Sequence, residues 1–213
     1  MERPRVLLAD DHRIVAEGLR SLLEPEFDLV GIVEDGRALL AAAEELLPDV
    51  IVADISMPLL NGIEAVRQIK RTNENIKIVF LTMHPDVTYA ASAFEAGASG
   101  YVLKHSAPSE LTTAIQSALQ GRTYVTPLLA GELMQFYKER PELRNAELGK
   151  LTPRQREVLQ LVAEGHSAKE IATILNISAR TVEFHKYRVM NALGITSGAE
   201  LVKYAIRHGI AAQ

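Results

Sequence analysis

Residues 52–65 read VADISMPLLNGIEA, a short apolar run that ends at Asp54 and leads through Pro58 and Gly62 into a longer amphipathic stretch. An apolar run bounded by turn residues predicts a buried strand, and the amphipathic stretch that follows predicts a helix. The same alternation recurs on both sides of this segment. The first part of the chain is therefore predicted to form strand-helix units around a parallel sheet.

Five short apolar runs are candidates for the strands of this sheet. Between the first two, apolar residues from Val15 to Leu23 recur at helical spacing and line one face. The last helix of this part, near residues 109–120, follows Pro108 and stops at Gly121. The predicted strands are residues 5–9, 29–33, 50–53, 76–81 and 100–103. Five strands and five helices are expected in an α/β domain over residues 1–122.

Residues 123–149 contain several helix breakers and are predicted to be a linker, with a possible short helix around residues 128–138. From residue 150 to residue 213 the pattern changes, because strand-like alternation disappears and helix-start signals follow at close spacing. Three segments match the S/T-x-x-E/Q capping box: residues 152–155, 167–170 and 197–200. Gly165, Gly194 and Gly209 stand where these short helices would end. The second domain is therefore predicted to be small and all-α.

Composition narrows the possible functions. The 213-residue chain has no cysteine, which excludes disulfides, thiolate metal sites and cysteine nucleophiles. No stretch approaches the length of a membrane span and no apolar signal region is visible, so a cytoplasmic protein without membrane contact is expected. The net charge of −4 is uneven: residues 1–150 carry 15 basic and 22 acidic groups, whereas residues 151–213 carry 8 and 5. The basic end suits a polyanion better than the acidic end.

Polar residues follow the predicted strands at the edge where ligands of open parallel sheets bind. Asp10 and Asp11 follow the first strand, Asp54 the third, Thr82 ends the fourth and Lys104 follows the fifth. Clustered carboxylates repel one another unless a hard cation compensates, and Mg²⁺ prefers oxygen ligands. The sequence thus predicts a metal site in which Asp54 is a nucleophile toward phosphorus. Lys104 and Thr82 would contact the phosphoryl oxygens.

Each of these residues also has an ordinary structural interpretation. An aspartate can cap a helix, a threonine can fill a strand and a lysine can be a solvated charge. Five suitable residues at matching strand ends favour the phosphoacceptor interpretation over five separate coincidences.

The segments LLADDH, VADISMPLLNGIEA, VFLTMH and GASGYVLK resemble the receiver domains of two-component response regulators, over about residues 3–121. The resemblance implies a flavodoxin-like sheet of order 2-1-3-4-5 and phosphorylation of Asp54 by a sensor histidine kinase. It also implies Mg²⁺ held by Asp11, Asp54 and the Ser56 carbonyl, with Asp10 acting through water.

The resemblance further implies a switch pair, Thr82 and Tyr101, in which the hydroxyl moves toward the phosphoryl group and the ring turns inward. For Tyr101 the interpretation as an ordinary core aromatic stays open. In receiver families the second residues after the phosphoacceptor and the switch threonine, here Ser56 and His84, affect the lifetime of the phosphoryl group.

Residues 151–195, LTPRQREVLQLVAEGHSAKEIATILNISARTVEFHKYRVMNALGI, resemble the LuxR-type helix-turn-helix. Asn176 and Ile177 form the predicted turn, and Ser178 caps the helix that would enter the major groove. Joined to a receiver, this domain resembles the NarL/FixJ family. That resemblance implies four helices, the last near residues 198–208 and often used for dimerisation, and a homodimer on promoter DNA after activation.

Within the groove-entering helix, Val182 and Val189 are seven residues apart and are expected to face the core. Glu183, Phe184 and Tyr187 are the candidates for contacts with base edges. Candidates for phosphate contacts, which position the domain without reading sequence, are Lys169, Arg180, Thr181, Lys186 and Arg188. Two positions depart from the family pattern: Ala168 stands where the family often has Asn, and Glu183 where some members have Lys.

Three other classes of protein fit the sequence less well. A phosphatase of the haloacid dehalogenase type needs a second aspartate two residues after the nucleophile, and position 56 is Ser. A ligand-sensing transcription factor would not need the acidic cluster, and a receiver that has lost its activity would lack an acid or the lysine. A phosphorylation-dependent transcription regulator, not an enzyme, is therefore the predicted function.

Overall fold

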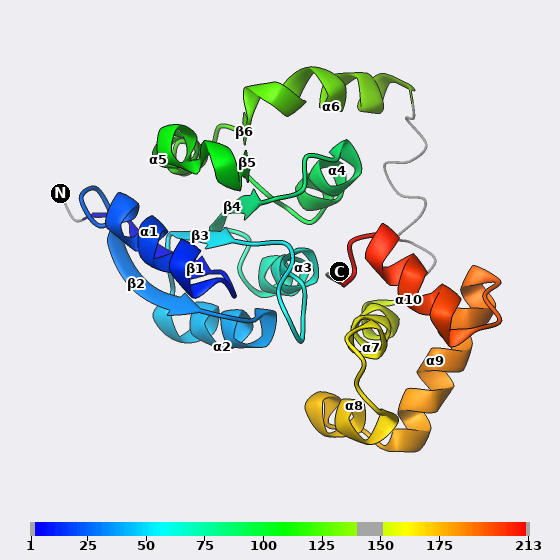
Figure 1. The fold of residues 1–213 in the computed structure, drawn as a ribbon. Helices are drawn as coiled ribbons and strands as arrows, with labels where there is room; N and C mark the ends of the chain where they lie inside the picture. The colour runs from blue at the N-terminus through cyan, green and yellow to red at the C-terminus, as the bar shows by residue number, and fades with distance from the viewer. Residues whose placement is uncertain (1–2, 140–150, 212–213) are drawn as a thin grey trace.

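The computed structural model describes residues 3–139 and 151–211. The N-terminal part contains one parallel sheet in the order β2-β1-β3-β4-β5-β6 (Figure 1). Its strands are β1 (Arg5–Ala9), β2 (Asp28–Val33), β3 (Val50–Ala53), β4 (Lys77–Thr82), β5 (Gly100–Leu103) and β6 (Tyr124–Val125). The predicted order 2-1-3-4-5 is confirmed, with β6 added beyond β5.

Helices cover both faces of this sheet, as the near-continuous apolar strands require. They are α1 (Arg13–Leu23), α2 (Gly36–Leu46), α3 (Gly62–Thr72), α4 (Val87–Glu95) and α5 (Ala107–Leu119), with a 3₁₀ turn, η1 (Lys104–Ser106). Successive strand residues point to opposite faces, so Leu7 belongs to the core beneath α2 and α3, and Leu8 to the core beneath α1 and α5. The five predicted helices are all present.

After residue 122 the predicted short helix is present, but the segment that contains it packs on the first domain. β6 pairs with β5, and α6 (Pro127–Glu139) follows it. Leu129 and Leu133 of α6 are buried in the same core as β3 and β4. Residues 123–139, predicted as linker with a possible short helix, therefore extend the sheet and core of the first domain. The remainder of the predicted linker, residues 140–149, lies outside the described residues.

The described residues of the C-terminal part form helices joined by short turns, as predicted. It contains α7 (Pro153–Ala163), α8 (Ala168–Leu175), α9 (Ala179–Leu193) and α10 (Gly198–Arg207). The capping boxes at Thr152 and Ser167 are both formed. At the third, Ser197 caps the helix, but the Glu200 carboxylate accepts from the amide of Thr196, so the reciprocal box is absent there.

Two left-handed residues shape this helical domain. Asn176 has φ 51° in the tight turn between α8 and α9, where its short polar side chain tolerates this conformation. Gly194 ends α9 with φ 67°, as its predicted cap position requires. Within the described residues, no helix is both long and apolar enough to cross a membrane.

Candidate functional site

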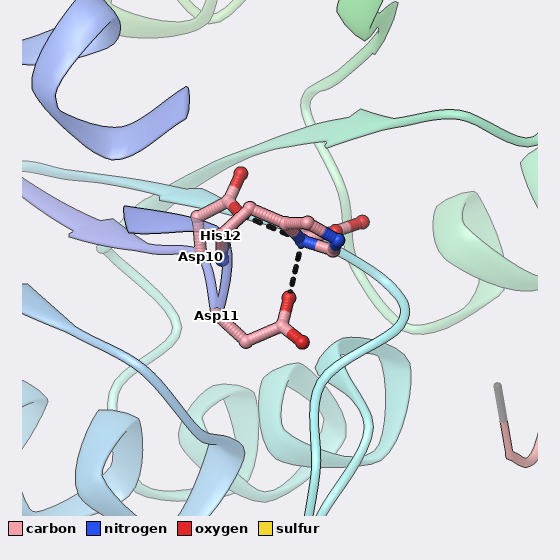
Figure 2. Close-up of side chains that lie close together, drawn as sticks. Asp10, Asp11 and His12 are labelled. Carbon is pink, nitrogen blue, oxygen red and sulfur yellow. Dashed lines mark hydrogen bonds and ion pairs between the residues drawn. The ribbon is translucent and has the colours of Figure 1, made fainter. Parts of the chain in front are cut away.

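Carboxylates from two neighbouring strands meet at the C-terminal edge of the sheet. Asp10 and Asp11 follow β1, and Asp54 follows β3; Figure 2 shows Asp10 and Asp11 beside His12. The strands pair so that Ala9 lies opposite Ala53, and the Asp54 amide donates to the Ala9 carbonyl at 2.8 Å. Ligand atoms of the three aspartates and His12 lie within 4.8 Å of one another. The sheet register therefore gathers the predicted acidic residues.

Lys104 brings a compensating charge into this cluster. Its Nζ lies 2.7 Å from Asp10 Oδ2 and 2.7 Å from Asp54 Oδ2. Burial raises the pKa of Asp54, and the ammonium of Lys104 offsets this only in part. Burial disfavours the charge of Lys104 itself, but the facing carboxylates outweigh it, so the pKa of Lys104 is raised. The site holds one cation among three carboxylates.

The donor set suits a hard cation. Asp10 Oδ2 and Asp11 Oδ1 are buried atoms that accept no hydrogen bond of ordinary geometry. His12 was not among the predicted site residues, although it stands in the LLADDH segment. Its Nδ1 lies 2.7 Å from Asp11 Oδ1, while its side chain is 62% exposed. Clustered carboxylate oxygens are the ligands that Mg²⁺ prefers, and His12 is better placed as a partner of Asp11.

The loop after Asp54 is tightly constrained. A Cβ on Gly62 would overlap the Asp54 carbonyl, so only glycine allows α3 to begin this close to β3. Asn61 caps α3 by accepting from the Glu64 amide. The Ser56 amide donates to Asp54 Oδ1 at 3.3 Å. The tight path of this loop thus has a steric cause at Gly62.

The predicted switch residues lie on β4 and β5. Thr82 is fully buried and its Oγ1 accepts from the His84 amide at 3.2 Å. The Tyr101 ring is also fully buried, and its hydroxyl donates to the His84 carbonyl at 2.8 Å. Burial raises the pKa of Tyr101, which keeps the phenol protonated. The ring is part of the core of the first domain.

His84 and Ser56 are in direct contact, with His84 Nε2 2.7 Å from Ser56 Oγ. Ser56 and His84, the two residues predicted to affect the lifetime of the phosphoryl group, therefore contact each other at the rim of the acidic cluster. Burial lowers the pKa of His84, and the nearby Asp54 charge offsets this only in part.

The helix α9 presents the face predicted to enter the groove. Val182 is buried against α7 and α8, and Val189 against α7 and α10, as expected. Phe184 and Tyr187 are 58% and 65% exposed, large values for aromatic side chains. The other candidates for DNA contact are distributed over α8 and α9: Glu183, Lys169, Arg180 and Arg188 are exposed, and Thr181 and Lys186 half-buried.

A set of polar residues that no sequence pattern predicted joins the two domains. Gln160 of α7 accepts from the Asn61 amide at 2.8 Å and donates to the Met57 carbonyl at 3.0 Å. Arg156 Nε donates to Glu64 Oε2 at 2.7 Å, and both side chains are nearly buried. These partners are about a hundred residues apart, so no local sequence signal identifies them.

Comparison with known proteins agrees with these two sites. Residues 6–116 match the response regulator receiver domain, and residues 149–205 match the bacterial regulatory proteins of the luxR family. The response regulator UvrY of Escherichia coli K12 is 35% identical over 212 residues, covering 96% of this chain and 94% of UvrY.

Solved structures of a second relative, RcsB, are also similar. RcsB of Salmonella enterica serovar Typhimurium, bound to a promoter in the presence of the phosphomimetic BeF₃⁻, is 31% identical. The match covers 95% of this chain and 98% of RcsB, with a TM-score of 0.61. A structure of two RcsB dimers bound to two parallel DNAs covers 95% of this chain and 98% of that one, at 31% identity and a TM-score of 0.58. This chain therefore belongs to the two-component response regulators that join a receiver to a LuxR-type DNA-binding domain, and it is a transcription regulator rather than an enzyme.

Proposed function

We propose that Asp54 accepts a phosphoryl group from a sensor histidine kinase. Its buried carboxylate beside Lys104, at the bottom of the acidic cluster, is the observation that carries this proposal. In the transfer a carboxylate oxygen of Asp54 attacks phosphorus and the bond from phosphorus to the histidine nitrogen breaks. Lys104, which now neutralises Asp10 and Asp54, then pairs with a phosphoryl oxygen, and the Thr82 hydroxyl donates to another.

The proposed cofactor is Mg²⁺, held by Asp11, Asp54 and the Ser56 carbonyl, with Asp10 supporting it through water. When bound, the ion neutralises the charge that gathers on the phosphoryl oxygens. The convergence of Asp10, Asp11 and Asp54, whose ligand atoms lie with one from His12 within 4.8 Å of one another, supports this assignment.

The DNA-binding half would act as a homodimer on promoter DNA in the cytoplasm. The RcsB structures with dimers and DNA support this part of the proposal. We assign the receiver to residues 1–139, because β6 and α6 pack on it, and the DNA-binding domain to residues 150–213; residues 140–149 of the predicted linker join the two. Tyr101 would be the switch aromatic, because its hydroxyl contacts the residue that follows Thr82 by two positions.

Magnesium should stabilise the folded receiver. At a Mg²⁺ concentration ten times its dissociation constant, linkage adds about 1.4 kcal/mol, which raises Tm by about 5 °C for a domain of this size. Asp11→Asn should reduce the shift strongly, whereas Asp28→Asn, at an exposed position of β2, should keep it. Thermal unfolding with and without MgCl₂ measures both. A full shift in Asp11→Asn would contradict the ligand assignment.

A second test concerns whether the receiver covers the DNA-reading face. The hydrogen bonds described between the domains involve α7 and the region of α10, while Phe184 and Tyr187 of α9 stay exposed. Residues 150–213 alone should therefore bind a single half-site about as tightly as the unphosphorylated full chain at matched salt. Phosphorylation would then act by pairing receivers, which raises the effective concentration of the second half-site reader. Clearly tighter binding by the fragment would instead favour occlusion.

A further inference from the structure

Tyr89 of α4 lies between the rim of the phosphorylation site and the end of the DNA-binding domain. On one side its ring stacks on His84, with centroids 4.3 Å apart and an interplanar angle of 1°. On the other side its hydroxyl approaches the Ile206 carbonyl of α10 at 3.5 Å. A Cβ on Gly209 would overlap the Tyr89 ring, so the backbone after α10 lies directly against it. One side chain thus contacts both domains.

The position of Gly209 is fixed by the docking of the two domains. The next residue, Ile210, is buried, and its carbonyl accepts from Asn61 Nδ2 at 3.2 Å. The Arg156–Glu64 pair holds α7 against α3 in the same region. When the domains are docked, the chain end after α10 is therefore held against Tyr89 by contacts that do not involve Tyr89 itself.

The other end of this series of contacts reaches Asp54. The Tyr89 ring holds one face of the His84 ring, and His84 Nε2 contacts Ser56 Oγ at 2.7 Å. The Ser56 amide in turn donates to Asp54 Oδ1 at 3.3 Å. The orientation of the His84 ring at the rim of the site thus depends on packing against Tyr89. The DNA-binding domain in turn packs against Tyr89.

Loss of the phosphoryl group from Asp54 is a hydrolysis. A water oxygen attacks phosphorus, the bond from phosphorus to the Asp54 oxygen breaks, and inorganic phosphate leaves while Asp54 regains its carboxylate and a proton is released. The chemical step requires the water to be oriented along the line of that bond. A polar side chain with a fixed ring at the rim can orient the water, whereas a mobile ring does so less often.

We propose that docking of the DNA-binding domain holds Tyr89 against His84 and thereby shortens the lifetime of the phosphoryl group on Asp54. Tyr89 is a positioning residue, since it acts through His84. The inference rests on the proposed function of Asp54. The docked form would lose its phosphoryl group quickly, while a form whose DNA-binding domain has moved away would keep it longer.

The test compares two glycines of the DNA-binding domain that have nearly the same backbone conformation. Gly209 has φ 65° and Gly194 has φ 67°, but a Cβ at Gly194 meets nothing within 4 Å. Both Gly→Ala changes introduce similar backbone strain, and only Gly209→Ala displaces Tyr89. The full-length variants are labelled with acetyl phosphate and Mg²⁺, and the decay of the phosphoprotein is followed. Gly209→Ala should decay about five-fold more slowly than wild type, and Gly194→Ala at the wild-type rate.

Two substitutions at Tyr89 distinguish the effect of ring packing from a general loss of structure. Tyr89→Phe keeps the stack on His84 and should decay at nearly the wild-type rate, whereas Tyr89→Leu should decay as slowly as Gly209→Ala. In a His84→Ala background, Gly209→Ala should have no further effect, because the two changes interrupt the same series of contacts.

Each outcome decides between the proposal and its alternatives. Unchanged decay in both Gly209→Ala and Tyr89→Leu would overturn the proposal, as would a Gly209→Ala effect that persists in full without His84. Equal slowing in Gly194→Ala would assign the effect to backbone strain and also overturn it. Wild-type protein that takes up no phosphoryl group would instead contradict the proposed function of Asp54, so the two failures are distinguishable.

Discussion

Replacing Asp54 with Asn should abolish phosphoryl incorporation from acetyl phosphate and Mg²⁺. The reaction needs a carboxylate oxygen to attack phosphorus while acetate leaves, and a neutral amide is a very poor nucleophile for this step. The product in the wild-type protein should be an acyl phosphate, detected as a mass increase of one phosphoryl group that is lost in base. Intact-protein mass spectrometry measures both properties.

The Asp54→Asn variant should remain folded, so loss of labelling would result from loss of the nucleophile and not from unfolding. Lys104 keeps Asp10 as a partner at 2.7 Å when the Asp54 charge is removed. Burial raises the pKa of Asp54, which means that its ionised form is disfavoured in the folded state, and a neutral side chain is therefore tolerated there. Asp28→Asn is the matched control and should label normally. Base-labile labelling that survives in Asp54→Asn would contradict the proposal that Asp54 is the phosphoacceptor.

The acidic cluster could be predicted because its members follow strands. A parallel sheet places the carboxyl ends of its strands at one edge, so Asp10, Asp54 and Lys104 had to converge once their strands were recognised. His12 was missed because its approach to Asp11 depends on a side-chain orientation that strand position does not determine. The strand assignments themselves were nearly complete, since buried parallel strands are continuous apolar runs.

β6 was missed for a different physical reason. Its two residues, Tyr124 and Val125, lie between the turn at Gly121 and the start of α6 at Pro127. A strand this short has no periodicity, and it forms because the exposed edge of β5 offers unpaired backbone groups. Tertiary context, which a local pattern does not contain, therefore decided the conformation of this segment.

No sequence pattern predicts the contacts between the domains. Gln160 and Arg156 lie on an ordinary amphipathic helix, and nothing local distinguishes their roles from those of other polar helix residues. Their partners, Asn61 and Glu64, stand on the loop and helix directly after the phosphoacceptor. The segment directly after Asp54 thus contacts the DNA-binding domain, which connects the two sites in space.

The geometry of α9 separates residues that would read bases from residues that would hold phosphates. Val182 and Val189 mark the buried side, and successive residues are rotated by about 100° around a helix. Phe184 and Tyr187 lie opposite the buried side, while Lys186 and Arg188 lie on its two flanks. The guanidinium of Arg188 is 6.0 Å from the Phe184 ring centroid, at the border between the two regions. A helix in the major groove has the backbone of one strand on each side, so the flanking cations are placed for phosphates.

The double variant Lys186→Ala and Arg188→Ala should therefore weaken binding to all DNA sequences alike, by roughly ten-fold to a hundred-fold at physiological salt. The slope of log affinity against log salt concentration should become shallower by about 0.9 for each contact removed. Binding titrations at several salt concentrations, on a specific promoter and on unrelated DNA, measure both effects. Lys203→Ala, which removes an exposed cation from α10, is the control and should leave the slope nearly unchanged.

Tyr187→Ala should behave differently from the double variant, because a base-edge contact carries sequence information and a phosphate contact does not. We expect its salt slope to match wild type while the preferred bases change at one or two positions of the half-site. Glu183→Ala is expected to change preference in the same way, since a carboxylate can accept from cytosine N4. Selection from a random DNA pool, followed by sequencing, gives the preference of each variant. An unaltered selected site in Tyr187→Ala would mean that another face of α9 enters the groove, because the exposed side opposite Val182 and Val189 would then make no contact with bases.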